Sequence, residues 1–336
     1  MFTITAWRRS VRLGIFCFYA AGLGAAALLG GCETAHKPRV SSASVSPYRG
    51  PPVILRRAVG NTDSKAPILG YDVASSALGF FNAQRVAVGL PAVMWDNRVA
   101  KAAAAHARYL IGHGEFSHTE ISGSSGFTGS DVTDRLRVQL PVSGTSEVLT
   151  RYGNSVSDGE AIRQLFASPY HRGVILFDWQ LAGAAEQRAD ATVLVVDFAN
   201  IRPVLAENEL IAYPYDGQTD VATTWTDNEV PDPLGDDSRF NGQRVGFPIT
   251  LSGGPNAHIE WRRALLSDAE GIAVPCHIAP LRAADSARNT AICTPLKPLR
   301  SATRYRVEAV GLLTQLSRFT TVAPFSLQFT FTTATD

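Results

Sequence analysis

The stretches F-S-H-T-E (Phe116–Glu120), T-S-E-V (Thr145–Val148) and S-P-Y-H-R (Ser168–Arg172) decide the fold of this 336-residue chain. Each places one of His118, Glu147 and His171 among polar or turn-forming neighbours rather than in an apolar run. Imidazoles and carboxylates in separate segments of this kind are typical of a site that the fold assembles. We therefore predict that the three side chains share one pocket.

Helices are predicted before these stretches and strands after them. Apolar residues at helical spacing predict a helix over Asp72–Val88, and an alanine-rich stripe predicts a second helix that ends at Gly112. The sequence S-D-G-E at residues 157–160 is typical of a capping box that opens a short helix. The apolar run at residues 191–199 predicts a buried central strand beside another at 181–187.

Short strands and turns replace the helix signals after residue 201. Phe325, Leu327, Phe329 and Phe331 alternate along the last of these strands and are expected to share one face. We predict a β-sandwich of immunoglobulin or fibronectin type III kind over residues 202–336. Residues 213–237 contain seven acids and no Lys or Arg. They are expected to form a solvated loop; calcium binding is the alternative, although the regular D-x-D-x-D-G spacing is missing.

The amino terminus has the pattern of an export signal. Three arginines precede an uncharged apolar run at residues 13–29, and the sequence then reads L-G-G-C up to Cys32. This ending resembles a bacterial lipobox, which implies that a signal peptide of residues 1–31 is removed and that Cys32 receives lipid. Glu33 follows the cysteine, so the resemblance favours the outer membrane. A plain signal peptide or a single membrane anchor is the alternative.

A Ser-, Pro- and Gly-rich segment at residues 32–70 is expected to be a flexible tether, in which the apolar run Val53–Leu55 is a candidate for packing. The remaining cysteines of the exported chain, Cys276 and Cys293, are predicted to form a disulfide, with two buried thiols as the alternative. Without the three leader arginines the formal charge of +1 becomes about −2, and no basic stripe indicates nucleic-acid binding.

The region at residues 71–201 resembles the CAP superfamily of cysteine-rich secretory, antigen 5 and pathogenesis-related proteins, in its bacterial form. The matching residues are F-N-A-Q-R and G-L-P-A-V-M-W-D within 81–96, the three stretches quoted above, Asp134-Arg135, Gly183 and V-V-D-F at 195–198. The resemblance implies an α+β chain in which a three-layer α-β-α CAP sandwich precedes the immunoglobulin-like domain. It also implies a groove with two histidines and two glutamates, of which His118, Glu147 and His171 match and the second glutamate, near Ser168, has no counterpart.

Two imidazoles and a carboxylate allow more than one function. They suit a polar ligand, such as a small lipid, a glycan or a peptidoglycan fragment, or a divalent ion such as Zn²⁺ or Ca²⁺. No nucleophile elbow or spare cysteine indicates covalent catalysis, so we expect an envelope-associated binding protein rather than an enzyme. The alternatives are a metal-dependent hydrolase or peptidase that uses His118, His171 and Glu147 as metal ligands, and a scaffold or adhesion protein that acts through its C-terminal domain.

Overall fold

The computed structural model describes residues 48–60, 72–235, 239–280, 289–317 and 320–335. The predicted leader, the lipidation site Cys32 and residues 33–47 and 61–70 of the predicted tether lie outside these ranges. None of the helices within the described ranges is long and apolar enough to cross a membrane.

Five helices are described, all before residue 176. They are α1 (Val73–Ala87), α2 (Asn97–His113), α3 (Val132–Arg137), α4 (Asp158–Ala167) and α5 (Pro169–Ile175). Asp72 caps α1 in a capping box, and Ser157 caps α4 by accepting a hydrogen bond from the backbone N–H of Glu160. The prediction that Gly112 ends the second helix is wrong: α2 runs to His113, and Gly114 in the left-handed conformation ends it.

A four-stranded sheet lies between these helices, in the order β2-β4-β5-β3. Its strands are β2 (Met94–Trp95), β3 (Thr145–Gly153), β4 (Trp179–Arg188) and β5 (Ala191–Ile201). The central strand β5 is antiparallel to both β3 and β4. It is buried along most of its length, as its apolar run predicts.

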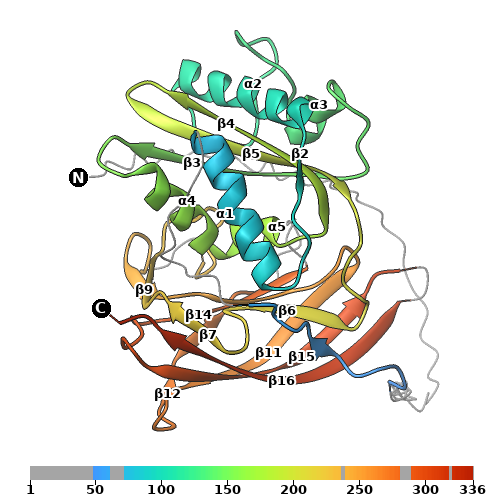
Figure 1. Ribbon diagram of the computed structural model, residues 1–336, viewed down its shortest axis with the longest axis vertical. Helices are drawn as coiled ribbons and strands as arrows, with labels where there is room; N and C mark the ends of the chain where they lie inside the picture. Colours follow the sequence, from blue (N-terminus) through green and yellow to red (C-terminus); the bar gives the residue numbers. More distant parts are fainter. Residues whose placement is uncertain (1–47, 61–71, 236–238, 281–288, 318–319, 336) are drawn as a thin grey trace, which may run out of the picture. The chain divides into compact units, whose positions relative to one another are not determined.

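Helices cover both faces of this sheet (Figure 1). On one face, Val193 and Val195 of β5 pack against Ala103 and Ala107 of α2. On the other face, Leu194, Val196 and Phe198 belong to the larger core that includes α1 and α4. Successive residues of a strand point to opposite faces, so one apolar strand supplies both cores and the result is a helix–sheet–helix arrangement.

In the described residues after 201, the C-terminal region contains strands and no helix. They are β6 (Glu209–Tyr213), β7 (Gln218–Val221), β8 (Thr224–Thr226), β9 (Arg244–Gly246), β10 (Ile249–Ser252), β11 (Ala257–Ser267), β12 (Ala273–Val274), β13 (Cys276–Ile278), β14 (Thr290–Pro295), β15 (Arg304–Gln315) and β16 (Thr321–Thr333). An earlier strand, β1 (Ile54–Leu55), pairs in parallel with β6, and Val53 beside it is buried. The apolar run at 53–55 therefore packs on the C-terminal region.

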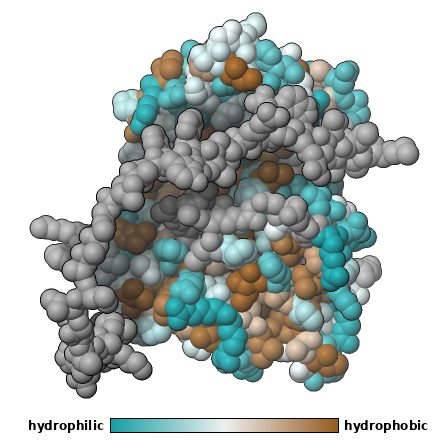
Figure 2. Space-filling view, turned by 180° about the vertical axis from the view of Figure 1, so that it is seen from behind, coloured by the Kyte–Doolittle hydropathy of each residue, from teal (hydrophilic) through white to brown (hydrophobic). Residues whose placement is uncertain are grey.

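Two five-stranded sheets result, in the orders β1-β6-β10-β14-β13 and β12-β11-β15-β16-β7, with β8 and β9 as a separate pair. Phe325, Leu327, Phe329 and Phe331 of β16 are all buried, so the predicted alternation of this strand is confirmed. Buried residues of both sheets belong to one hydrophobic cluster, which also reaches the helical region. On the face seen in Figure 2, hydrophobic and hydrophilic residues lie side by side.

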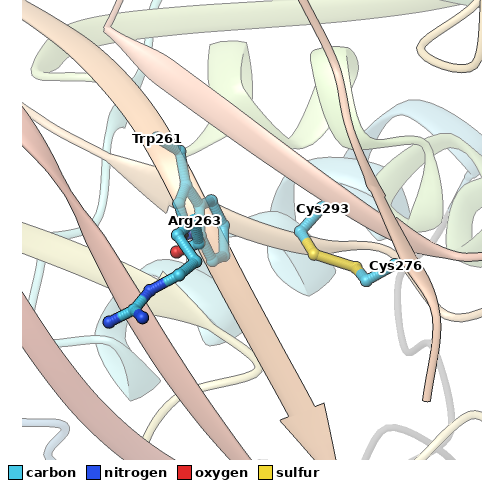
Figure 3. The surroundings of a disulfide bond; sticks show 4 residues. All are labelled: Trp261, Arg263, Cys276 and Cys293. Carbon is cyan, nitrogen blue, oxygen red and sulfur yellow. Dashed lines mark hydrogen bonds between the residues drawn. A yellow bond between two sulfur atoms is a disulfide. The ribbon is translucent and has the colours of Figure 1, made fainter. Parts of the chain in front are cut away.

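The predicted disulfide is confirmed. Cys276 of β13 and Cys293 of β14 are bonded, with their Cα atoms 5.7 Å apart. Trp261 of β11, in the other sheet, lies beside the bridge, and its indole N–H donates to the carbonyl of Arg263 (Figure 3).

Candidate functional site

The structure brings the three predicted site residues together. His118 lies in the loop between α2 and α3, Glu147 on β3 and His171 on α5. All three line one cavity of about 520 Å³, within the range of small-molecule sites. Its wall also carries five hydroxyl groups, from Thr119, Thr133, Thr145, Ser146 and Tyr170.

Glu147 is the best-connected of the three residues. Its Oε1 lies 2.7 Å from Nδ1 of His118, which must carry the hydrogen because a carboxylate only accepts. Its Oε2 accepts from Nη2 of Arg135 at 2.7 Å. Burial works against the ionised form, but the hydrogen bond from His118 and the charge of Arg135 hold the pKa of Glu147 below its ordinary value. Glu147 is therefore an anion at neutral pH.

Arg135 also fixes the backbone that presents His118. Its guanidinium is fully buried and donates to the carbonyl of His118 through Nη1 at 3.3 Å and Nη2 at 3.2 Å. The imidazole of His118 is thereby held at one edge of the cavity, with about half of its side chain exposed to solvent.

A second layer of polar groups supports the loop after α2. His106 is fully buried on α2, with Nδ1 2.9 Å from Oε1 of Glu120 and Nε2 3.0 Å from the carbonyl of Ser117. Glu120 also accepts from the backbone N–H and the hydroxyl of Thr128. His106 thus has a structural role, since it holds the loop that carries His118.

Asp197 lies directly across from Glu147 on the neighbouring strand β5. Burial and the adjacent charge of Glu147 raise the pKa of Asp197 well above its ordinary value. The two neighbouring carboxyl groups are therefore shifted in opposite directions: the pKa of Glu147 is lowered and that of Asp197 is raised.

Comparison with known proteins identifies the helical region. Residues 78–176 match the model of CAP, the cysteine-rich secretory protein family. The chain contains a CAP domain. No curated protein matches the chain by sequence.

Solved structures that are similar to this chain include the following two. An outer surface protein from Borrelia burgdorferi is 17% identical, covering 37% of this chain and 90% of that one, with a TM-score of 0.32. An extracellular protein containing an SCP domain from Bacillus anthracis strain Ames is 18% identical, covering 38% of this chain and 40% of that one, also with a TM-score of 0.32.

A residue from outside the matched CAP region, Glu229, completes the surroundings of His171. Its carboxylate accepts from the backbone N–H of Tyr170 at 3.0 Å and of His171 at 2.7 Å, and Oε1 lies 3.1 Å from Nδ1 of His171. Burial, with the charge of His118, lowers the pKa of His171 to about 3, and burial raises the pKa of Glu229 to about 8. At neutral pH the pair is an uncharged imidazole beside a protonated carboxyl.

Glu229 is not among the predicted site residues, because the acidic segment at residues 213–237 is expected from its sequence to be a solvated loop. That expectation is wrong in two ways: the segment contains the strands β7 and β8, and Asp227, Glu229 and Asp232 are 1%, 4% and 7% exposed. The residues around Glu229 do not distinguish a buried acid from an exposed one. Its burial depends instead on how the C-terminal strands pack against α5. The only local signal is the interruption of the acidic series by this apolar pair.

The donor geometry does not fit a metal ion shared by the three site residues. Among the described residues, no three His, Cys, Asp or Glu side chains are placed to hold one together. Both oxygens of Glu147 already accept from His118 and Arg135, and Nδ1 of His171 faces Glu229. A cation here would also lie close to the guanidinium of Arg135.

Arg172, next to His171, does not face the groove. It does not pair with Asp178 either. Its fully buried guanidinium donates to the carbonyls of Phe166, Ala167 and Pro248, and Asp178 instead accepts from the backbone N–H of Val204.

Proposed function

We propose that this chain is an exported, lipid-anchored protein of the cell envelope that binds a glycan, such as a peptidoglycan fragment, in the groove of its CAP domain. The lining of the groove is the observation that supports this most. Five residues with hydroxyl groups, two histidines and two acids, Glu147 and Asp131, line one open cavity. Hydroxyl, imidazole and carboxylate groups provide the alternating donors and acceptors that a polyhydroxylated ligand needs.

The charge of the groove favours a neutral ligand over an anionic one. Glu147 is ionised, His171 is uncharged, and Arg135 uses its charge on Glu147. Apolar side chains, including Val174 and Val230, provide surfaces for the C–H faces of sugar rings. Hydrolysis with a bound metal has less support because the histidines and Glu147 do not converge as ligands.

The export proposal rests on the leader and on Cys32. Globomycin, which blocks lipoprotein signal peptidase, should make the precursor accumulate in the native host. A precursor that is processed normally under this treatment would remove the lipid anchor from the proposal.

We further propose that the C-terminal sheets form an immunoglobulin-like sandwich. Three features support it: two sheets whose strand order follows that of such domains, a buried Trp261 on β11 facing a disulfide, and Tyr305 near the start of β15. The hydroxyl of Tyr305 accepts from the backbone N–H of Arg300 at 2.8 Å, as in the tyrosine corner of these domains.

Calorimetric titration with N-acetylglucosamine oligomers and with a muropeptide digest tests the binding function. Wild-type protein should release heat with a saturable isotherm, and the His118→Ala/His171→Ala double variant should bind at least about tenfold more weakly, which corresponds to about 1.4 kcal/mol. His258→Ala, on β11 and outside the cavity lining, is the control and should bind like wild type. Equal binding by the wild type and the double variant contradicts the proposal.

A further inference from the structure

A short segment of the C-terminal region, Asn228–Pro231, borders the groove of the CAP domain. Val230 and Pro231 line the cavity described above, and Asn228, Glu229 and Val230 line a second cavity, also of about 520 Å³. The side chain of Val230 is 81% exposed although it is apolar. An exposed valine that borders two cavities at once is well placed to contact a ligand.

The two cavities adjoin. Both are lined by His118, Thr119, His171 and Val230. The first continues toward the hydroxyls of Thr133 and Thr145. The second continues along β3 and α4 toward Leu149, Arg151 and Gln164, with Phe116 at its edge. Together they form one elongated site with Val230 at its junction.

The segment is anchored at two points just before its exposed tip, Val230. Glu229 accepts two backbone N–H groups from the first turn of α5, whose own N-cap, Ser168, makes no side-chain capping bond. The chain before it is held by Asp227, whose backbone N–H donates to the carbonyl of Gln243 at 2.9 Å. The position of Val230 and the orientation of His171 therefore depend on the same carboxyl group.

We propose that Asn228–Pro231 is part of the ligand site, in which Val230 contacts the ligand at the junction of the cavities and Glu229 positions His171. The occupant is an oligosaccharide that passes Val230 and places sugar units in both cavities. This inference rests on the proposed glycan binding. It adds that the CAP domain and the C-terminal region form a single binding unit.

Oligomer length and a variant at the junction test the role of Val230. The mature chain is titrated with the monomer, dimer and tetramer of N-acetylglucosamine. Wild type should bind the tetramer at least about tenfold more tightly than the dimer, and Val230→Asp should abolish most of this difference because it places an unpaired charge against the sugar faces. Val138→Asp changes an exposed valine that ends α3 and lines neither cavity. It should leave the difference in affinity between the tetramer and the dimer unchanged.

The outcomes separate this inference from the function on which it rests. If wild type binds none of the oligomers, both fail. If it binds the tetramer but Val230→Asp does so equally well, or if the dimer and the tetramer bind alike, only the composite site is overturned.

The positioning role of Glu229 has its own readout in the ¹⁵N resonances of the His171 ring. Glu229→Ala should shift these resonances and weaken tetramer binding, whereas Glu229→Gln, which keeps one acceptor for the backbone of α5, should show a smaller change in both. Asp190→Asn, at an exposed acid in the turn between β4 and β5, is the control. Unchanged His171 resonances in Glu229→Ala overturn the positioning role.

Discussion

Among single residues, Glu147 connects the exposed part of the site to its buried support. It accepts from His118 at the cavity wall and from Arg135 behind it, and it lies opposite Asp197, whose pKa is raised by burial and by the charge of Glu147. A buried ion pair contributes little compared with an apolar pair, but removal of one partner leaves the other charge uncompensated. The pair of Glu147 and Arg135 therefore makes the geometry of His118 sensitive to any change of charge at this position.

Glu147→Gln should destabilise the fold by about 3 kcal/mol, because the guanidinium of Arg135 loses its counter-ion in a buried place. Urea denaturation at pH 7 measures this. Glu207→Gln, at an exposed glutamate in the C-terminal region, should lie within about 0.5 kcal/mol of wild type. Equal losses for the two variants would mean that the ion pair does not stabilise the site.

The raised pKa of Glu229 predicts that the stability of the fold depends on pH. Its folded-state pKa of about 8 lies above the ordinary value of 4.5, so the folded chain retains a proton that the unfolded chain releases between these values. The contribution of Glu229 to stability should therefore fall as the pH rises from 4.5 to 8, whereas that of His171, whose folded-state pKa of about 3 lies below the ordinary 6.5, should rise with pH up to 6.5. His171, Arg172 and Asp227 face this carboxyl.

Thermal unfolding of wild type and Glu229→Gln across this range measures the effect. The variant cannot titrate here, so its midpoint should fall less steeply with pH. Since burial and Asp232 raise the pKa of Asp227 to about 7, Asp227 adds a slope of the same sign to both proteins, and only the difference between the two curves reports Glu229. Parallel curves would contradict the prediction.

At the scale of elements, the contact between α2 and β4 depends on Gly183. A Cβ atom at this position would lie 2.1 Å from the backbone nitrogen of Ala100, so α2 would have to move away from the sheet. Gly183→Ala should cost about 3 kcal/mol, at the upper end for overpacking. The movement would also disturb His106, which supports the loop of His118 from α2.

Gly112→Ala, on α2 itself, is the matched control. A Cβ there meets nothing within 4 Å, and alanine is the better helix former, so this variant should be more stable than wild type by up to about 1 kcal/mol. Chemical denaturation of the two variants should give changes of opposite sign. Changes of the same sign would mean that the close approach at Gly183 is not what limits the packing of α2.

Elements with a strong local pattern could be predicted from the sequence. The helix at Asp72–Val88, the cap at Ser157, the alternating phenylalanines of β16 and the buried run of β5 all follow from residues within a few turns or one strand. The end of α2 was placed too early because Gly112 and Gly114 carry the same signal, and only the backbone conformation distinguishes them.

The candidate site also contains residues that could be predicted from the sequence and one that could not. His118, Glu147 and His171 lie in recognisable stretches, so their shared cavity follows from the family resemblance. Glu229 lies 58 positions after His171, in a segment without a characteristic pattern. Its contact with α5 is set by the packing of two regions of the chain, which no local sequence pattern specifies.

At the scale of the whole molecule, Arg172 joins the CAP domain to the C-terminal sheets. Burial lowers its pKa to about 10, so it remains charged at neutral pH. Its guanidinium lies 4.8 Å from the ring centre of Tyr213 and 4.6 Å from that of Phe247, and it donates to the carbonyl of Pro248 at 2.7 Å. These partners all belong to the C-terminal region, whereas Arg172 lies on α5 beside His171. The buried guanidinium of Arg172 therefore connects α5, at the groove, to the C-terminal sheets.

Arg172→Leu should weaken this junction more than a substitution at any exposed residue. The reason is that buried carbonyl groups of both regions lose their hydrogen-bond donor. A loss of about 4 kcal/mol is expected from several unsatisfied groups. Arg172→Lys should also be destabilised, since an ammonium lacks the planar set of donors that reaches carbonyls on both sides.

Differential scanning calorimetry should show one transition for wild type and two for Arg172→Leu. Arg137→Leu, at an exposed arginine of α3, should keep a single transition. If Arg172→Leu also unfolds in one transition with an unchanged midpoint, Arg172 does not couple the two regions, and Glu229 must hold α5 against the C-terminal strands without it.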